Sequence, residues 1–371
     1  MPRVLLLTAF DPRTAARDAL RGKHGGVERY VRAIATGIRS HGFDACVVGS
    51  SDRRGSFVES GVAYRLLPRL GMPGGAPLFP WPVPFVGEAF DLVHVQATYP
   101  FLTDLAPLLA RLRGVPAVAT CHFDVVGRAR PETDLSRLYY RLLGARSYRA
   151  YDRVIYSTRG YADASRSAPW VSPERTRIIP MGVDPSQFRP LPDAVRARHA
   201  LFVGRLAWFK GVRVLLDAFE GRLRREGWRL TVVGDGPERS AVESRIAGSD
   251  GRARLLTDVS DDELVRLYNE ATVTVLPSIA PQESFGMTLL ESLACGTPVV
   301  ASRWPGVSEV AGIRGVTVEP GDGRALADAI AEVGAWELSA ADRRALAERV
   351  ASEYSWDVIA SKTVAVYREL L

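Results

Sequence analysis

The feature that most constrains the fold is a repeated alternation of short apolar runs with longer stretches of helical spacing. From Gly26, for example, Val27, Tyr30, Val31 and Ile34 recur at helical intervals. The apolar runs in the first half of the chain are Val4–Thr8, Ala45–Val48, Leu92–Val95, Ala117–Thr120 and Val154–Tyr156. Short apolar runs between helices are typical of parallel strands covered on both faces. This half therefore predicts a doubly wound α/β domain.

The same alternation restarts after residues 189–192. Its candidate strands are Leu201–Val203, Leu230–Val233, Val273–Leu276 and Pro298–Ala301. A chain of 371 residues is also too long for one ordinary core. In such sheets ligands bind beyond the carboxyl ends of the strands, so two arrays predict two Rossmann-like domains facing a central cleft. We expect a first domain over 1–185, a second over 186–353, and a C-terminal helix over 354–371 that packs back on the first.

Several classes of protein do not fit the composition. No apolar run reaches the roughly 18 to 20 residues that span a bilayer. The N-terminus has the pattern of a strand rather than of a signal peptide. The three cysteines, Cys46, Cys121 and Cys295, are far apart and form no Cys-x-x-Cys pair. We expect a reduced, cytoplasmic protein without structural zinc.

The charge is uneven along the chain. Residues 1–190 carry 26 Lys/Arg and 16 Asp/Glu, a net of +10, whereas residues 191–371 carry 22 and 26, a net of −4. The basic half suits an anionic membrane surface or a phosphorylated acceptor, or it is simply a soluble surface. Nucleic acid is disfavoured because basic-aromatic clusters and reading helices are missing.

One arginine-rich segment leaves the membrane question open. Its basic and apolar residues are Arg137, Leu138, Tyr139, Tyr140, Arg141, Leu142, Leu143, Arg146, Arg149 and Arg153. It is either an interfacial helix that contacts anionic lipid on the cytoplasmic membrane face, or a solvated helix packed on its sheet.

The strongest motif runs from Glu283 to Glu291 and is followed by Gly-Thr-Pro-Val-Val. A strand ends near Pro277, and a helix is predicted to start near Gly286. The first N–H groups of that helix lack intrahelical partners and can hold an anion such as a diphosphate. The two glutamates could then accept hydrogen bonds from hydroxyls at opposite ends of a nucleotide-sugar.

Two cations complete this picture. Arg205 follows a predicted strand, and Lys210 lies just before the next helix. At the carboxyl end of a sheet they would neutralise a diphosphate and stabilise it as a leaving group. The chain has no Asp-x-Asp. We therefore expect no metal and no cofactor, the nucleotide-sugar being a co-substrate.

The N-terminal half adds weaker candidates. Gly25 and Gly26 open a helix after the first strand, where glycine permits close approach of the backbone to an anion. His122 follows a strand, and His94 is either an acceptor contact or a core residue. Lys23 and His24 flank the glycines. In the second half, the turn Gly234-Asp235-Gly236-Pro237 either shapes the chain or contacts ligand.

On these residues the chain resembles the GT-B glycosyltransferases of family 4, also called group 1 glycosyltransferases. The likeness covers most of both halves and is densest over 178–301. It includes the segment Ile179-Pro-Met-Gly-Val-Asp184, in which Met181 stands where Asn is commoner, and Thr120-Cys-His122.

The resemblance implies a retaining, metal-independent transfer of a hexosyl group from a UDP- or GDP-sugar to a hydroxyl acceptor. It implies catalytic roles for His122, Glu283, Arg205 and Lys210. Donor binding is implied for Gly25, Gly26, Arg205, Lys210, Val259, Ser284, Phe285, Gly286, Met287 and Glu291. The acceptor is lipid-linked, a saccharide or a small molecule. A GT-B nucleotide-sugar epimerase and a DNA-modifying glucosyltransferase remain alternatives.

Overall fold

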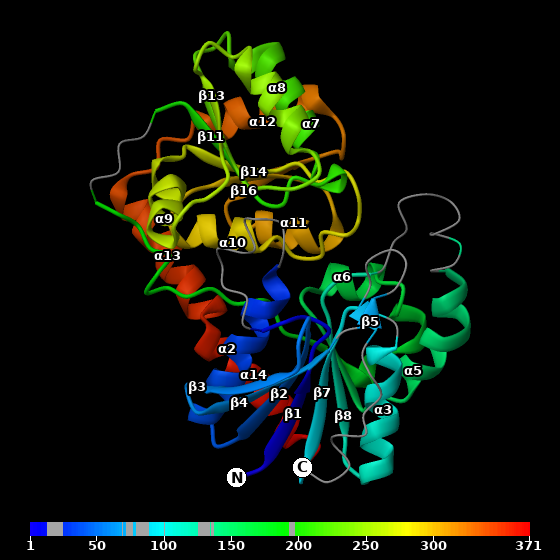
Figure 1. The fold of residues 1–371 in the computed structure, drawn as a ribbon. Coiled ribbons are helices and arrows are strands. Elements are labelled where there is room, and N and C mark those ends of the chain that lie inside the picture. The colour runs from blue at the N-terminus through cyan, green and yellow to red at the C-terminus, as the bar shows by residue number, and fades with distance from the viewer. Residues whose placement is uncertain are drawn as a thin grey trace. The chain divides into compact units, whose positions relative to one another are not determined.

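The computed structural model shows a chain that divides into two compact units (Figure 1). The first unit consists of Met1–Arg13, Val27–Met181 and Trp356–Leu371, and the bulk of the second is Gly182–Ser355. Each unit is built around its own parallel sheet. The structure describes residues 1–12, 25–68, 70–71, 77–78, 89–99, 101–124, 134, 137–192 and 197–371.

The sheet of the first unit has the strand order β10-β9-β8-β7-β1-β2-β4-β3. Its pairs are parallel except that β3 runs antiparallel to β4. The strands are β1 (Arg3–Leu7), β2 (Asp44–Ser51), β3 (Gly55–Glu59), β4 (Val62–Pro68), β7 (Leu92–Ala97), β8 (Ala117–Cys121), β9 (Arg153–Tyr156) and β10 (Thr176–Ile178). A short antiparallel pair joins β5 (Leu70–Gly71) and β6 (Pro77–Leu78). The central strands β1, β7 and β8 are buried almost throughout, which accounts for their continuous apolar runs.

Helices cover this sheet. They are α2 (Gly26–Ser40), α3 (Leu102–Arg113), α5 (Ala145–Arg149), α6 (Arg159–Ala164) and α14 (Trp356–Arg368). Shorter helical turns are the π-helical η2 (Tyr140–Gly144) and the 3₁₀ turns η3 (Ala168–Trp170) and η4 (Pro173–Arg175). The buried face of α2 includes Tyr30, Val31 and Ile34, as its spacing predicted.

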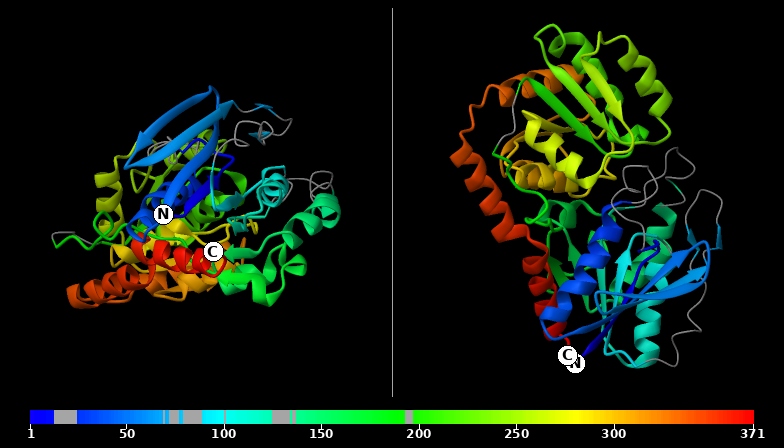
Figure 2. Two further views of the ribbon diagram at one scale, coloured as in Figure 1. Left: turned by 90° about the horizontal axis from the view of Figure 1, so that it is seen from below. Right: turned by 60° about the vertical axis from the view of Figure 1, so that its left-hand side comes forward.

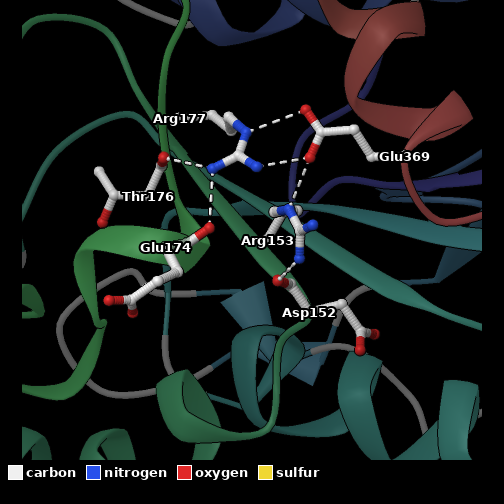
Figure 3. Close-up of polar contacts among 6 residues, drawn as sticks. All are labelled: Asp152, Arg153, Glu174, Thr176, Arg177 and Glu369. Atoms are coloured by element: carbon white, nitrogen blue, oxygen red, sulfur yellow. Dashed lines mark hydrogen bonds and ion pairs between the residues drawn. The ribbon is translucent and has the colours of Figure 1, made fainter.

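The C-terminal helix α14 lies alongside α2 in the first unit (Figure 2). The Trp356 ring meets the Tyr30 ring edge-on at 6.1 Å. Beyond the end of α14, the Glu369 carboxylate accepts hydrogen bonds from Nε of Arg153 at 2.9 Å and Nε of Arg177 at 3.1 Å (Figure 3). Arg153 is the first residue of β9, and Arg177 lies on the edge strand β10. These hydrogen bonds therefore hold the segment after α14 against the edge of the sheet.

The sheet of the second unit is parallel throughout, in the order β13-β12-β11-β14-β15-β16. Figure 2 shows its helices on both faces of the sheet. The strands are β11 (His199–Val203), β12 (Arg229–Val233), β13 (Ala253–Leu256), β14 (Val273–Leu276), β15 (Val299–Ser302) and β16 (Gly315–Val318). The helices and helical turns are η5 (Trp208–Lys210), α7 (Val212–Ala218), η6 (Phe219–Leu223), α8 (Arg239–Ala247), α9 (Asp261–Glu270), α10 (Met287–Ala294), α11 (Pro305–Ala311), α12 (Gly323–Gly334) and α13 (Ala340–Tyr354). This is a doubly wound order whose direction of progression reverses between β11 and β14.

Every strand that the sequence predicted is present, so two doubly wound α/β units are confirmed. Pattern reading missed β3, β4, β5, β6, β10, β13 and β16. Strand β3 has no buried residue, and β16 is short and only partly buried, so neither has a continuous apolar run. In the described part of the chain, no helix is both long and apolar enough to cross a membrane.

Candidate active site

Two loops meet where the second sheet reverses its strand order. The loop after β11 carries Arg205 and Lys210, and the loop after β14 carries Glu283. The N–H of Ile279 donates to the carbonyl of Phe209 at 2.8 Å, which ties one loop to the other. Gly211 has φ +67°, and a Cβ there would lie 1.9 Å from the carbonyl oxygen of Pro277. Only glycine permits this approach.

The structure brings two of the predicted catalytic residues into direct contact. Nζ of Lys210 forms an ion pair with Oε2 of Glu283, and the two side chains are only 18% and 13% exposed. Arg205, five residues before Lys210, is exposed. Its guanidinium forms no hydrogen bond or ion pair with any residue that the structure describes. The carboxyl ends of β11 and β14 therefore present an ion pair beside a cation that has no side-chain partner among the described residues.

The N-terminus of α10 opens beside the same loop. Gly286 precedes the helix with φ +87°, and no side chain caps the first turn. A Cβ on Gly286 would lie 3.1 Å from side chains of Leu276 and Leu289, so both backbone conformation and packing require glycine here. Ser284 and Met287 are partly exposed, whereas Phe285 is buried. An uncapped helix N-terminus next to cations is suited to an anion.

Glu291 lies on the buried side of α10. Glu291 is 4% exposed, and its Oε2 accepts a hydrogen bond from the Tyr268 hydroxyl at 2.8 Å. Two glutamates at this spacing commonly lie on a solvated helix face, but the burial of Glu291 excludes that arrangement here. Val259, in the loop before α9, is also buried. The sequence did not single out Tyr268, because an aromatic residue on the buried face of a helix cannot be distinguished from an ordinary core residue by its pattern.

The loop after β12 packs against the backbone on either side of Arg205. A Cβ on Gly234 would lie 1.9 Å from the carbonyl oxygen of Gly204, and one on Gly236 would lie 2.6 Å from that of Leu206. The N–H of Leu206 donates to the carbonyl of Asp235 at 2.8 Å. The Gly-Asp-Gly-Pro turn therefore shapes the site by backbone packing. Its glycines allow the loops after β11 and β12 to touch.

Two polar atoms near the loop after β14 were not singled out by the sequence. Among the described residues, the Ser278 hydroxyl and Oε1 of Gln282 are buried and have no hydrogen-bond partner. Buried polar groups are nearly always paired, so unpaired ones need an explanation. Their position in the loop that carries Glu283 adds hydrogen-bonding capacity to this edge of the sheet.

His122 lies in the first unit, just after β8. The residue is 6% exposed, and Nε2 lies 2.7 Å from Oε1 of Gln96. Its ring meets Tyr30 edge-on at 4.9 Å. Desolvation by burial lowers the pKa of His122 to about 3, so the imidazole is neutral near pH 7. Gln96 was missed, although a polar side chain in the buried strand β7 is the signal that could have found it.

His94, on the same strand as Gln96, is a core residue. It is fully buried, with Nδ1 2.6 Å from the Tyr367 hydroxyl and Nε2 2.7 Å from Oγ1 of Thr120. The sequence left core packing and acceptor contact open, and the structure places His94 between β8 and α14.

The predicted glycine pair lies at the start of α2. Gly26 is the first residue of that helix, and Gly25 is exposed. Their neighbours Lys23 and His24 lie outside the described residues.

Comparison with known proteins places both halves of the chain. Residues 24–187 match the family model "Glycosyltransferase Family 4", and residues 197–335 match "Glycosyl transferases group 1". A D-inositol 3-phosphate glycosyltransferase of Acidothermus cellulolyticus is 32% identical over 330 residues, which cover 77% of this chain and 72% of the relative.

Solved structures share the fold. Sucrose-phosphate synthase from Thermosynechococcus elongatus superposes with a TM-score of 0.77 at 22% identity, covering 100% of this chain and 99% of that one. Anabaena HepE, solved in complex with UDP, gives 0.75 at 19% identity and covers both chains completely. The fold is that of GT-B glycosyltransferases. With both halves matched and a relative similar over most of its length, the chain belongs to the family 4, or group 1, glycosyltransferases.

Proposed function

We propose that this glycosyltransferase moves a hexosyl group from a UDP- or GDP-sugar to a hydroxyl acceptor, with retention at the anomeric carbon and without a metal ion. The observation that carries the proposal is the arrangement at the carboxyl ends of β11 and β14. There Arg205, Lys210 and Glu283 lie on loops that adjoin the uncapped N-terminus of α10. A diphosphate needs cations and N–H donors, and a sugar needs hydroxyl acceptors.

In this arrangement the charges have separate tasks. Lys210 and Arg205 offset the negative charge that grows on the diphosphate as the glycosidic bond breaks, which is electrostatic stabilisation of a leaving group. The N–H groups of the first turn of α10 add donors to the same oxygens. Glu283 and Glu291 accept hydrogen bonds from donor hydroxyls. Because Glu291 is already held by Tyr268, its carboxylate is preorganised for this role.

The donor assignment draws support from the comparisons as well. HepE, whose structure resembles this one across its whole length, was solved with UDP. Retention is supported by the family resemblance in the motif around Glu283. Metal independence is supported by the two cations, which supply the charge that a divalent ion would otherwise bring.

For the acceptor we propose a phosphorylated polyol, with D-inositol 3-phosphate the first compound to test. The relative from Acidothermus cellulolyticus is named for that substrate. The net charge of +10 over residues 1–190 also suits an anionic acceptor.

The test begins with thermal unfolding in the presence of UDP-, GDP- and ADP-sugars. A raised midpoint with one of them identifies the donor, because a ligand that binds only the folded chain stabilises it. The chain is then incubated with that donor and D-inositol 3-phosphate in excess EDTA. Mass spectrometry should show a hexosyl product, and the anomeric proton coupling should show the donor's configuration retained.

Each contrary result removes a defined part of the proposal. Loss of turnover in EDTA that Mg²⁺ or Mn²⁺ restores would contradict metal independence. An inverted product would contradict retention. Donor turnover to an isomeric sugar without acceptor would indicate an epimerase. A product with another sugar alcohol but none with D-inositol 3-phosphate would overturn the acceptor alone.

A further inference from the structure

Exposed apolar side chains gather on two neighbouring elements of the first unit. Most large hydrophobic residues that the structure describes are buried, and nine are exposed. Six of these nine lie on α3, at its N-terminal flank, or on the helical segment 137–149. They are Phe101, Leu108, Leu112, Leu138, Leu142 and Leu143. Single exposed leucines are ordinary, but a concentration on one pair of elements marks an interaction surface.

The two elements pack against each other, so their outward faces adjoin. The Tyr139 hydroxyl donates to Oδ1 of Asp104 on α3 at 3.0 Å, and the Ser147 hydroxyl on α5 donates to the same carboxylate. Leu109 of α3 and Tyr140 are buried in one hydrophobic core. Figure 1 shows α3 and α5 side by side.

The outward leucines repeat at helical spacing. Leu108 and Leu112 are four residues apart on α3, as are Leu138 and Leu142 on the neighbouring segment. All four are exposed, from 44% for Leu108 to 70% for Leu112. We call this region the α3–α5 surface and define it by Leu108, Arg111, Leu112, Leu138, Arg141, Leu142, Leu143 and Arg146.

Exposed arginines lie among these leucines. Arg111, Arg141 and Arg146 are exposed, and none forms a hydrogen bond or ion pair with a residue that the structure describes. Arg137, beside Leu138, pairs with the exposed Asp134 at 3.4 Å, its one ion-pair partner among the described residues. The surface therefore combines protruding aliphatic chains with an excess of positive charge.

We propose that the α3–α5 surface docks on an anionic lipid bilayer. Leucine side chains enter the boundary between headgroups and acyl chains, while guanidinium groups bind headgroup phosphates. An acidic soluble protein would account for the arginines but not for so many exposed leucines. A symmetric contact between two copies would bring two positively charged surfaces together. The proposal concerns binding alone and is independent of the transfer reaction.

The test is flotation of the full chain with two kinds of vesicle, pure phosphatidylcholine and phosphatidylcholine with phosphatidylglycerol. The chain should float with the anionic vesicles, and high salt should weaken its binding. Leu142→Gln combined with Leu143→Gln should lower the partition coefficient about tenfold or more. Val58→Gln is the matched control, since Val58 is 73% exposed on β3, away from the α3–α5 surface.

A second pair of variants separates local from overall charge. Arg141→Gln with Arg146→Gln should weaken binding about fivefold for each charge removed. Arg53→Gln with Arg54→Gln removes the same charge from exposed positions before β3 that have no partner among the described residues, and should change binding little. Circular dichroism and unchanged unfolding midpoints verify that the variants fold.

Three results would overturn the proposal: no flotation of the wild-type chain, equal binding to both vesicle types, or equal loss in both arginine pairs. Sedimentation analysis tests whether a second copy of the chain occupies this surface instead. A dimer that the leucine substitutions convert to monomer would assign the surface to protein contact instead.

Discussion

At the scale of single residues, Lys210 carries the largest expected effect. Its ammonium pairs with Glu283 at the reversal point of the second sheet, and both side chains are largely shielded from solvent. A cation aimed at charge that grows in the transition state should raise the rate itself, by an amount comparable with an oxyanion donor.

We expect Lys210→Ala to lower kcat/KM for the nucleotide-sugar roughly 100-fold or more. Lys210→Arg should restore only part of the loss, because the planar guanidinium is bulkier than an ammonium and directs its donors differently. Arg225→Ala is the control, since Arg225 is exposed and unpaired among the described residues. If Lys210→Ala stays within about threefold of wild type, which is roughly 0.7 kcal/mol, Lys210 is not a phosphate ligand.

Gln96 is the second residue with a specific expectation. Its side-chain oxygen lies at hydrogen-bond distance from Nε2 of His122, and both residues are buried. With the amide so oriented, Nε2 of His122 carries the proton and Nδ1 is left as an acceptor.

Gln96→Ala should therefore lower kcat while changing KM for the donor little, because the imidazole loses the contact that fixes its tautomer. Gln96→Asn retains an amide on a shorter chain and should restore part of the rate. Kinetics of both variants, together with ¹⁵N chemical shifts of the His122 ring, provide the measurement. Unchanged ring shifts in Gln96→Ala would show that Gln96 does not position His122.

At the scale of elements, the C-terminal helix α14 depends on contacts at both of its ends. Trp356 meets α2 at one end, and Glu369 meets Arg153 and Arg177 just past the other. Hydrogen bonds from Arg177, with a further contribution from Arg153, lower the pKa of Glu369. A depressed carboxyl pKa stabilises the folded chain above the unfolded pKa, and this contribution disappears as the pH falls through the folded value.

Glu369→Gln should loosen the last turn of α14 at neutral pH, with a cost in overall stability of about 1 kcal/mol or less, because the groups are partly exposed. Hydrogen exchange of the α14 amides is the measurement, and their protection should fall selectively. Glu319→Gln breaks the exposed pair with Arg303 in the second unit and should leave α14 unaffected. Equal protection of α14 in Glu369→Gln and wild type would show that the network is not an anchor.

At the scale of the whole molecule, acid stability should be limited by three buried histidines of the described chain, His94, His122 and His199. Burial lowers the pKa of His94 and His122 to about 3 and that of His199 to about 4, and His122 adds to the shift of His94. The unfolded chain binds protons at these rings below pH 6.5, which the folded chain resists. Stability should therefore fall as the pH drops from about 6.5 towards 3, by roughly 1.4 kcal/mol per pH unit for each histidine.

His94→Gln should flatten this dependence. The variant is expected to be less stable at pH 7, because Tyr367 and Thr120 lose a well-placed partner, yet its unfolding should take up about one proton fewer near pH 5. Calorimetric unfolding in buffers of different ionisation enthalpy measures the uptake. Identical proton uptake in the variant and wild type would show that His94 does not titrate between the two states.

The sequence by itself determined the two parallel sheets, because strands buried on both faces must be apolar throughout and therefore stand out. It also determined the helix start at Gly286, since a glycine after a strand and loop marks the start of α10. The pairing of Lys210 with Glu283 was different. Those residues are 73 positions apart. They meet only because β11 and β14 are neighbours in space, with Gly211 allowing backbone contact between their loops.

Tertiary structure alone decided which polar residues are buried. In the sequence, Glu291 and His94 cannot be distinguished from an exposed glutamate or histidine. Glu291 is buried by the packing of α9, and His94 by the packing of α14. Exposed edge strands such as β3 escaped prediction for the converse reason, because a strand at the edge of the sheet lacks the apolar pattern of a buried one. A periodic sequence thus fixes what each element is, whereas the partners of its polar side chains follow from strand order and helix packing, which connect residues far apart in the chain.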